Sequence, residues 1–324
     1  MFDSALSQRY KHIVWSVDLE KLDFSKPSIR RWWITTVLRE GTARDIAELD
    51  FEEVKRLLPS LYLPKPVKDL WAAYFDSRKS QSGAPPPPSP SGQAQPKHLP
   101  CLEPGMLTDA QKEILKVFAE TEGASEFYLT GGTALAAFYL HHRYSEDLDL
   151  FTGKEDLVPI TSRAFERNLE REGFALEVLL RTSSFVRLLI SKGGGKVKVE
   201  IAQDTPYRLA PVVRTEYGVN VDSLEDIAAN KMLALFGRAE PRDFVDVYFL
   251  VKEYFDFPKL LEMAGRKDTG FDEYWLAIAL RQIEDMEELP VAMRAPFDFD
   301  AMKTFFLSEA NKIMERIKGG KQDL

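Results

Sequence analysis

The spacing of apolar residues in the first part of the chain is helical. Residues 32–39, residues 43–49 and a run that begins at Pro66 each place apolar side chains three or four positions apart, as on one face of a helix. Aromatic residues at this spacing usually pack into a core, so we assign the tryptophans of these runs to the interior. Residues 1–78 are therefore predicted to form a small, mostly helical domain, and nothing in it resembles a catalytic constellation.

The segment of residues 79–105 has a different composition. It includes the stretch SQSGAPPPPSPSGQAQPKHLP, in which few apolar side chains are available for burial and the prolines favour an extended polyproline conformation. Such a segment acts as a semi-rigid linker, and the parts on either side of it are expected to fold as separate units.

From residue 106 onwards, strands and helices alternate along the chain. The apolar patterns predict helices over 108–120, 133–142 and 160–172, strands over 126–130, 146–151, 184–191 and 196–202, and a helical remainder. Helices interleaved with strands of a shared sheet indicate a compact α/β or α+β fold, of which we expect α+β. We expect residues 106–324 to form one domain, with a core of a mixed sheet and flanking helices at about 127–250 and a helical C-terminal part at about 223–324.

Composition and charge exclude several classes of protein. With 324 residues, 44% of them hydrophobic, the chain can form more than one ordinary core. Its single cysteine, Cys101, excludes an internal disulfide, and no run of about 18 to 20 apolar residues could cross a bilayer. We therefore expect a soluble, cytoplasmic protein without a membrane partner. Residues 106–324 carry 28 basic and 38 acidic side chains, which argues against broad capture of nucleic acid and leaves room for a local basic groove.

The strongest chemical signal lies in residues 127–151, FYLTGGTALAAFYLHHRYSEDLDLF. A predicted strand runs into two glycines, so the backbone can approach an anion closely, and a helix follows. Gly131, Gly132 and Thr133 are the candidate cradle for the phosphates of a nucleotide. Taken alone, the same glycines are more simply an ordinary turn.

Acidic residues of the following strands supply a candidate metal site. Asp147 and Asp149 are two positions apart in a predicted strand, so both carboxylates point to one face. Two adjacent anions repel unless a divalent cation neutralises them, and oxygen ligands suit Mg²⁺. Glu200 lies on the polar face of residues 196–202 and is a candidate third metal ligand or general base. The simpler alternative for these carboxylates is a solvated strand face.

Two predicted helices carry further charged residues. Lys231 lies within the apolar run IAANKMLALF, in a helix with Ser223 as its N-cap, and a buried lysine requires a phosphate or carboxylate partner. Pro241 marks the start of the next helix, in which Asp243 and Asp246 share a face. Asp246 lies among apolar residues and also needs a partner. In the alternative interpretation, the ammonium group of Lys231 reaches water and Asp243 only complements the helix dipole.

Three stretches together resemble the nucleotidyltransferase toxin family AbiEii/AbiGii, a branch of the polymerase-β-like nucleotidyltransferase superfamily. They are LTGGTALAAFYLHHRYSEDLDLF, VKVEIA and NKMLALFGRAEPRDFVDVYFL, in the order of the family. The resemblance implies a polymerase-β-like fold and an enzyme that uses Mg²⁺ or Mn²⁺ to transfer a nucleotide from a nucleoside triphosphate to an acceptor hydroxyl. It also implies the acceptor end of tRNA as substrate, and a toxin of a toxin–antitoxin or phage-defence system.

The resemblance also assigns roles to individual residues. Gly131 and Gly132 would cradle the triphosphate, Asp147 and Asp149 would hold the metal, Lys231 would contact phosphate, and Asp243 or Asp246 would complete the site. The wider superfamily often has serine after the two glycines, so a hydroxyl contact to phosphate would here come from Thr133.

Residues 1–78 resemble a small helical domain encoded beside or fused to such toxins. The chain would then carry its own partner domain in addition to any separate antitoxin. We expect this domain to dock on, or gate, the active site.

The sequence leaves two other functions open. One is nucleotidylation of a small molecule or a protein by the same core, and the other is a regulatory binding module with an inactive core. A basic groove would favour RNA as the acceptor, and the candidate is Arg163, Arg167 and Arg171 on one face of a predicted helix. Nearby glutamates instead favour a solvated, salt-bridged face.

Overall fold

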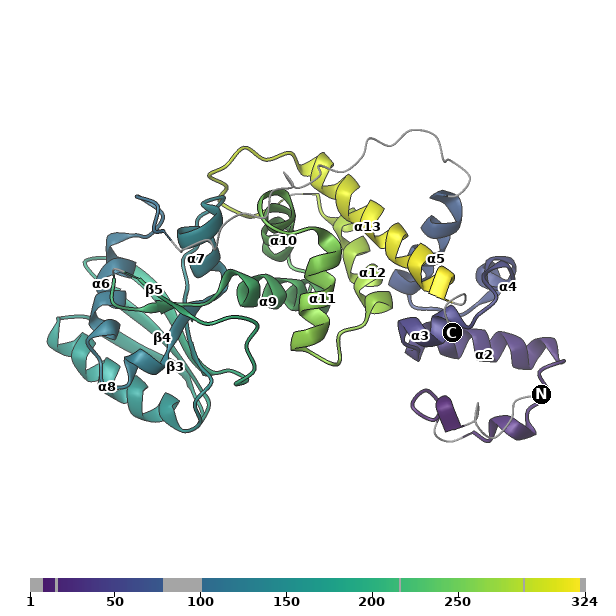
Figure 1. Cartoon of the computed structure of the whole chain (residues 1–324), viewed down its shortest axis with the longest axis horizontal. Coiled ribbons are helices and arrows are strands. Elements are labelled where there is room, and N and C mark those ends of the chain that lie inside the picture. The colour runs from purple at the N-terminus through teal and green to yellow at the C-terminus, as the bar shows by residue number, and fades with distance from the viewer. Residues whose placement is uncertain (1–7, 15–16, 78–100, 216, 288, 321–324) are drawn as a thin grey trace.

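The computed structural model describes residues 8–14, 17–77, 101–215, 217–287 and 289–320. The molecule is elongated, with a β-sheet at one end, the C-terminal helices in the middle and the N-terminal helices at the other end (Figure 1). Most of the predicted linker lies outside the described residues. None of the described helices is both long and apolar enough to span a bilayer.

A mixed sheet forms one end of the molecule. Its strands are β1 (Tyr128–Thr130), β2 (Leu148–Thr152), β3 (Ala175–Arg181), β4 (Phe185–Lys192), β5 (Gly195–Gln203), β6 (Val213–Arg214) and β7 (Asn220–Val221). They lie in the order β3-β4-β5-β2-β1-β7-β6. Strands β2 and β5 are parallel, as are β1 and β7, and the other neighbouring pairs are antiparallel.

Apolar and polar residues alternate along the central strands, and this alternation gives the sheet two different faces. In β2, Leu148 and Leu150 are fully buried, whereas Asp149 between them is not. Helices α6 (Asp109–Ala119) and α8 (Leu157–Arg171) pack on the apolar face. The polar side chains of the sheet therefore lie on the side away from α6 and α8.

The remaining helices of residues 101–320 lie before, between and after the strands in the chain. A short helix, α7 (Gly131–Leu135), continues into a π-helical turn, η4 (Ala136–Leu140), between β1 and β2. The others are η3 (Ala124–Glu126), α9 (Leu224–Gly237), α10 (Pro241–Glu253), α11 (Phe257–Lys267), α12 (Glu273–Arg281), η5 (Gln282–Asp285) and α13 (Phe299–Gly319). The predicted start of α9 is confirmed, because the Ser223 side chain accepts a hydrogen bond from the backbone N–H of Asp226.

The predicted α+β fold, a mixed sheet with flanking helices, is confirmed. The prediction that the chain after residue 202 is entirely helical is wrong, because β6 and β7 extend the sheet beyond β1. The apolar pattern also misses β3, which is an edge strand. Its residues Val178, Leu179 and Leu180 are all exposed, so the strand lacks the alternating burial that makes a strand recognisable.

The N-terminal unit consists of short helices, as predicted. They are η1 (Leu19–Lys21), α2 (Pro27–Glu40), α3 (Ala43–Ala47), α4 (Phe51–Leu57), η2 (Leu58–Ser60) and α5 (Lys65–Ser77). Helices α3 and α5 pack against α12 and α13, and the buried apolar residues of both parts form one continuous core. The unit is thus docked on the C-terminal helices.

Hydrogen bonds of buried aromatic side chains fix this junction. The hydroxyl of Tyr274 donates to the carbonyl oxygen of Leu38 at 2.8 Å and accepts a hydrogen bond from Nε1 of Trp71 at 3.2 Å. The indole of Trp275 donates to the carbonyl oxygen of Gly41 at 3.0 Å. Because buried polar groups are costly to leave unpaired, these contacts select one orientation of the two parts.

We expect Tyr274→Phe to lower the free energy of unfolding by about 1 to 3 kcal/mol, because it leaves a buried carbonyl oxygen and a buried indole N–H without a partner. Urea denaturation followed by tryptophan fluorescence measures the change. The matched control is Tyr62→Phe, which should have no effect because Tyr62 is 89% exposed. Equal effects of the two substitutions would contradict the role given to the junction.

Candidate functional site

A pocket of about 430 Å³ lies between the polar face of the sheet and helices α9 and α10. Six of the nine residues expected from the sequence line it: Gly131, Gly132, Asp147, Asp149, Glu200 and Lys231.

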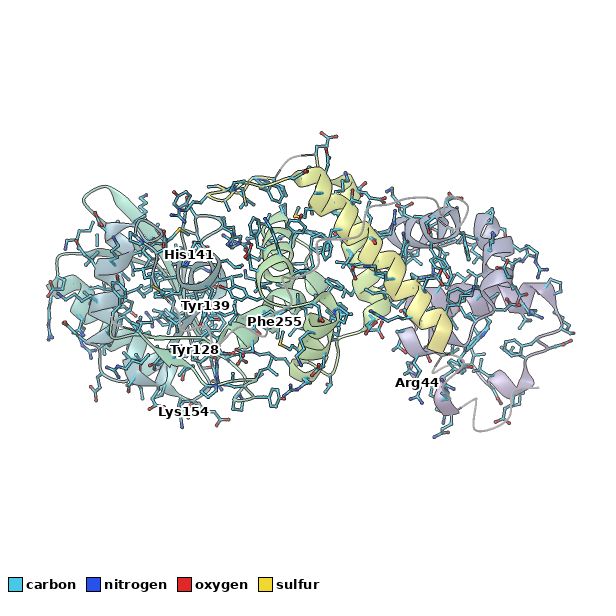
Figure 2. All side chains as sticks on the ribbon, turned by 45° about the horizontal axis from the view of Figure 1, so that its top comes forward. Arg44, Tyr128, Tyr139, His141, Lys154 and Phe255 are labelled. Atoms are coloured by element: carbon cyan, nitrogen blue, oxygen red, sulfur yellow. The ribbon has the colours of Figure 1, made fainter. Side chains whose placement is uncertain are left out.

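The N-terminal unit does not reach this pocket. All the described lining residues lie between positions 130 and 242, so the expected docking of residues 1–78 on the active site is not what the structure shows. Tyr128 in the sheet and Arg44 in the N-terminal unit lie in opposite halves of the molecule (Figure 2). The shared core with α12 and α13 explains why the unit docks away from the pocket.

Gly131 and Gly132 allow the side chains of Asp149 and Arg143 to lie where a Cβ atom would otherwise be in close contact with them. Gly131 has a φ of +70°, and a Cβ atom there would lie 2.1 Å from Oδ2 of Asp149. A Cβ atom on Gly132 would lie 2.6 Å from Nη2 of Arg143. The turn after β1 therefore presents bare backbone to the pocket, directly against an acidic and a basic side chain.

Strand pairing brings the acidic residues of β2 and β5 together. Asp149 and Glu200 are register partners in the parallel pair of strands, and Asp147 comes two residues before Asp149. The ammonium of Lys198 lies 2.7 Å from Oδ2 of Asp147 and 3.7 Å from Oε1 of Glu200. Nε of Arg187 donates to Oε1 of Glu200 at 2.9 Å.

Asp149 differs from its neighbours because no cation is bonded to it among the described residues. Burial, together with the nearby carboxylate of Glu200, raises the pKa of Asp149 to about 6. A set of carboxylate oxygens with incomplete neutralisation is the donor set that Mg²⁺ and Mn²⁺ prefer. The pocket therefore fits a divalent cation beside Asp149.

The three expected metal ligands are nevertheless not gathered at one point. Within the described part of the chain, no three His, Cys, Asp or Glu side chains lie close enough together to hold a metal ion as they stand. Lys198 and Arg187 engage oxygens of Asp147 and Glu200, respectively. A cation bound by all three carboxylates would require these two basic side chains to move.

Asp246, expected to complete the site, lies behind the pocket wall. It is fully buried, and Nε and Nη2 of Arg143 donate to its two oxygens at 2.7 and 2.8 Å. Nε2 of His142 lies 2.8 Å from Oδ1, and Nζ of Lys231 lies 2.7 Å from Oδ2. Burial alone would raise the pKa of Asp246, but Lys231 and Arg143 hold it well below its usual range.

Asp243, the other candidate on α10, is also fully buried and pairs with basic side chains that line the pocket. Nε and Nη2 of Arg238 donate to its carboxylate at 2.7 and 2.9 Å, and Nζ of Lys231 lies 3.8 Å away. The partner required by the burial of Lys231 is thus a carboxylate. Three basic side chains, Arg143, Lys231 and Arg238, line the pocket and are positioned by these two aspartates from behind.

Thr133 does not present its hydroxyl to the pocket. The side chain is 1% exposed, and its hydroxyl donates to the backbone carbonyl oxygen of Asp147 and lies 2.8 Å from Oγ of Ser145. The expected contact of Thr133 with phosphate is therefore corrected: the hydroxyl fixes the backbone beside Asp147, while Ser145 lines the pocket.

Several lining residues were not among those expected from the sequence, namely Arg143, Ser145, Arg187, Lys198 and Arg238. For Lys198 a signal existed, because it alternates with apolar residues on the same strand face as Glu200. Arg143 lies in a segment without regular spacing, so its partner on α10 is set only by the tertiary fold.

Comparisons with known proteins find chains that resemble this one. A protein of Aquifex aeolicus (strain VF5), the uncharacterized protein aq_aa25, is 25% identical over 211 residues, which are 64% of this chain and 98% of that one. Among solved structures, JHP933 from Helicobacter pylori matches 69% of this chain and 97% of its own, with 21% identity and a TM-score of 0.43. MenT4, a nucleotidyltransferase toxin of Mycobacterium tuberculosis H37Rv, matches 82% of this chain and 90% of its own, with 16% identity and a TM-score of 0.45.

The family match is the decisive comparison. Residues 113–316 match the family described as nucleotidyl transferase AbiEii toxin, type IV toxin–antitoxin system. This range is more than half of the 324 residues and contains the whole pocket. The chain therefore belongs to the AbiEii family of nucleotidyltransferase toxins.

Proposed function

We propose that this nucleotidyltransferase uses Mg²⁺ or Mn²⁺ to transfer a nucleotide from a nucleoside triphosphate to a hydroxyl at the acceptor end of tRNA. Transfer to that end would stop translation, as expected of a toxin controlled by an antitoxin. Both substrates are cytoplasmic, so we place its action there. The observation that carries the proposal is one pocket in which unpaired carboxylate charge faces three positioned cations.

The carboxylates of Asp147 and Asp149 are the groups that would hold the metal ion, and Glu200 beside them would act as the general base instead of a third ligand. When bound, such an ion neutralises charge on the reacting phosphates. The bare backbone of Gly131 and Gly132 borders the same carboxylates, which supports it as the place where the triphosphate lies.

Basic side chains on the opposite wall would hold the remaining phosphate charge. Arg143, Lys231, Arg238 and Arg242 carry four positive charges, and three carboxylates, those of Asp243, Asp246 and Glu240, pair with them. The excess positive charge faces the pocket and is held in place before substrate arrives, so little reorganisation is needed on binding.

In the reaction, the acceptor oxygen forms a bond to the α-phosphorus in line with the bond to the bridging oxygen, which breaks to release pyrophosphate. The proton of the acceptor hydroxyl passes to the carboxylate of Glu200. Arg187 orients that carboxylate through a 2.9 Å hydrogen bond. The same chemistry would serve a small-molecule or protein acceptor, so the acceptor has to be identified by experiment.

We expect full-length protein incubated with Mg²⁺, each labelled nucleoside triphosphate in turn and total tRNA to place label on the tRNA. Chelation of the metal and Asp149→Ala should each abolish labelling. Gel electrophoresis of the RNA reports the result. Label that appears only on a protein or a small molecule of a cell lysate would refute tRNA as the acceptor.

Removal of the carboxylate charge at Asp149 and at Asp246 should have different effects on the free energy of unfolding. We expect Asp149→Asn to abolish transfer and leave the free energy of unfolding equal or higher, because no bonded cation loses its partner. Asp246→Asn should lower that free energy by about 3 to 5 kcal/mol, because Arg143 and Lys231 lose a shared buried carboxylate. Chemical denaturation of both variants provides the comparison, and equal losses of stability would contradict it.

Two glycine substitutions distinguish the contact between Gly131 and Asp149 from the strain of a positive φ. Gly131→Ala should abolish transfer, because the new methyl group displaces the carboxylate of Asp149. Gly173 also has a positive φ, +80°, but an added Cβ there meets nothing within 4 Å. Gly173→Ala should therefore cost about 1 to 2 kcal/mol of stability and preserve transfer. Similar activities of the two variants, measured by tRNA labelling, would exclude the proposed contact.

A further inference from the structure

The polar face of the sheet continues beyond the pocket onto β4. Phe185, Arg187 and Leu189 share one side of this strand and are partly exposed, whereas Val186 and Leu188, which alternate with them, are fully buried. The buried side faces α8. The partly exposed side is therefore the side of the pocket, which Arg187 itself lines.

Strand β5 adds basic residues to the same surface. In the register of β4 and β5, Leu189 lies opposite Lys198, and the next pair on that side places Lys196 opposite Ser191. We call Phe185, Arg187, Leu189, Lys196 and Lys198 the outer sheet face.

The outer sheet face is accessible, and its charge is compensated only in part, because Arg187 pairs with Glu200 and Lys198 with Asp147. The side chains of Arg187 and Lys198 are 40% and 35% exposed, and Lys196 is exposed and has no ion-pair partner among the described residues. The guanidinium carbon of Arg187 lies 5.2 Å from the ring centroid of Phe185. Cationic and apolar side chains thus alternate along β4 and β5, and the exposed Glu177 of β3 lies opposite Leu189 on the same side. The domain as a whole is acidic.

We infer that the outer sheet face binds the single-stranded end of the acceptor RNA, an inference that rests on the proposed function. Flat surfaces that combine an aromatic ring with basic side chains bind single strands, because bases stack on the ring and phosphates pair with the cations.

The surface is also continuous with the reacting groups. Arg187 is bonded to Glu200, and Lys198 is bonded to Asp147, so an RNA strand lying on the outer sheet face ends at the carboxylates. The arginines considered from the sequence, Arg163, Arg167 and Arg171, lie exposed on α8, which packs on the opposite face of the sheet. They cannot guide an RNA end into this pocket.

Steady-state labelling of tRNA by the full-length protein tests the inference. Phe185→Ala and Lys196→Glu should each raise the KM for tRNA by about fivefold or more, in line with the loss of one stacked base or one phosphate contact. The KM for the nucleoside triphosphate should stay unchanged, because neither side chain lines the pocket. Lys196→Glu should also weaken the salt dependence of binding to a fluorescent single-stranded RNA.

Arg167→Glu is the matched control, with the same change of charge on an exposed residue of the opposite face, and should leave the KM for tRNA unchanged. An unchanged KM for tRNA in Phe185→Ala and Lys196→Glu, or an equal increase in Arg167→Glu, would overturn the inference while the proposed function stands. A wild-type protein that labels no RNA would instead overturn the proposed acceptor. Thermal unfolding of the variants shows whether each is folded.

Discussion

The architecture of the pocket depends on the buried carboxylate of Asp246. This group on α10 is bonded to Arg143 and His142, which follow η4, and to Lys231 on α9. A buried ion is tolerated only when it is paired, so these three segments cannot separate without leaving a charge unpaired in the interior. Asp246 therefore fixes α9 and α10 relative to the segment that connects the glycine turn to β2, and these are the two walls of the pocket.

The carboxylate of Asp149 has the opposite environment, although it belongs to the same pocket. Asp246 has more donors than oxygens, whereas Asp149 lies against bare backbone at Gly131 and beside the carboxylate of Glu200. The first arrangement stabilises the fold, and the second leaves charge to be neutralised by a ligand. Proteins accept such local electrostatic cost mainly where a substrate or a metal removes it, which is why we propose that the unpaired carboxylate lies at the reacting end of the pocket.

Local patterns were sufficient to predict the helices, most of the central strands and six of the pocket residues, because burial alternates with period two in β2, β4 and β5. They could not distinguish the environment of Asp149 from that of Asp246. A carboxylate among apolar residues gives the same sequence pattern whether it faces a cavity or a buried arginine. For the same reason, Arg143 was not predicted to line the pocket, and Thr133 was wrongly predicted to contact phosphate. The roles of such residues are set by partners distant in the sequence, about 100 residues away for Arg143 and Asp246.

The position of the N-terminal unit limits how it can influence the pocket. It contacts α12 and α13, and α12 in turn packs against α9, the helix that carries Lys231. The described residues of the N-terminal unit do not cover the pocket in this arrangement, because the lining residues lie between positions 130 and 242. An effect on activity could pass through α12, which packs against α9, or through α13, whose Phe306 ring packs against Phe244 of α10. The buried bond between Lys231 and Asp246 opposes a shift of α9 against α10. The shared core thus holds the unit against the helices that lie behind the pocket, so a partner that blocks the pocket would have to reach it from another part of the surface.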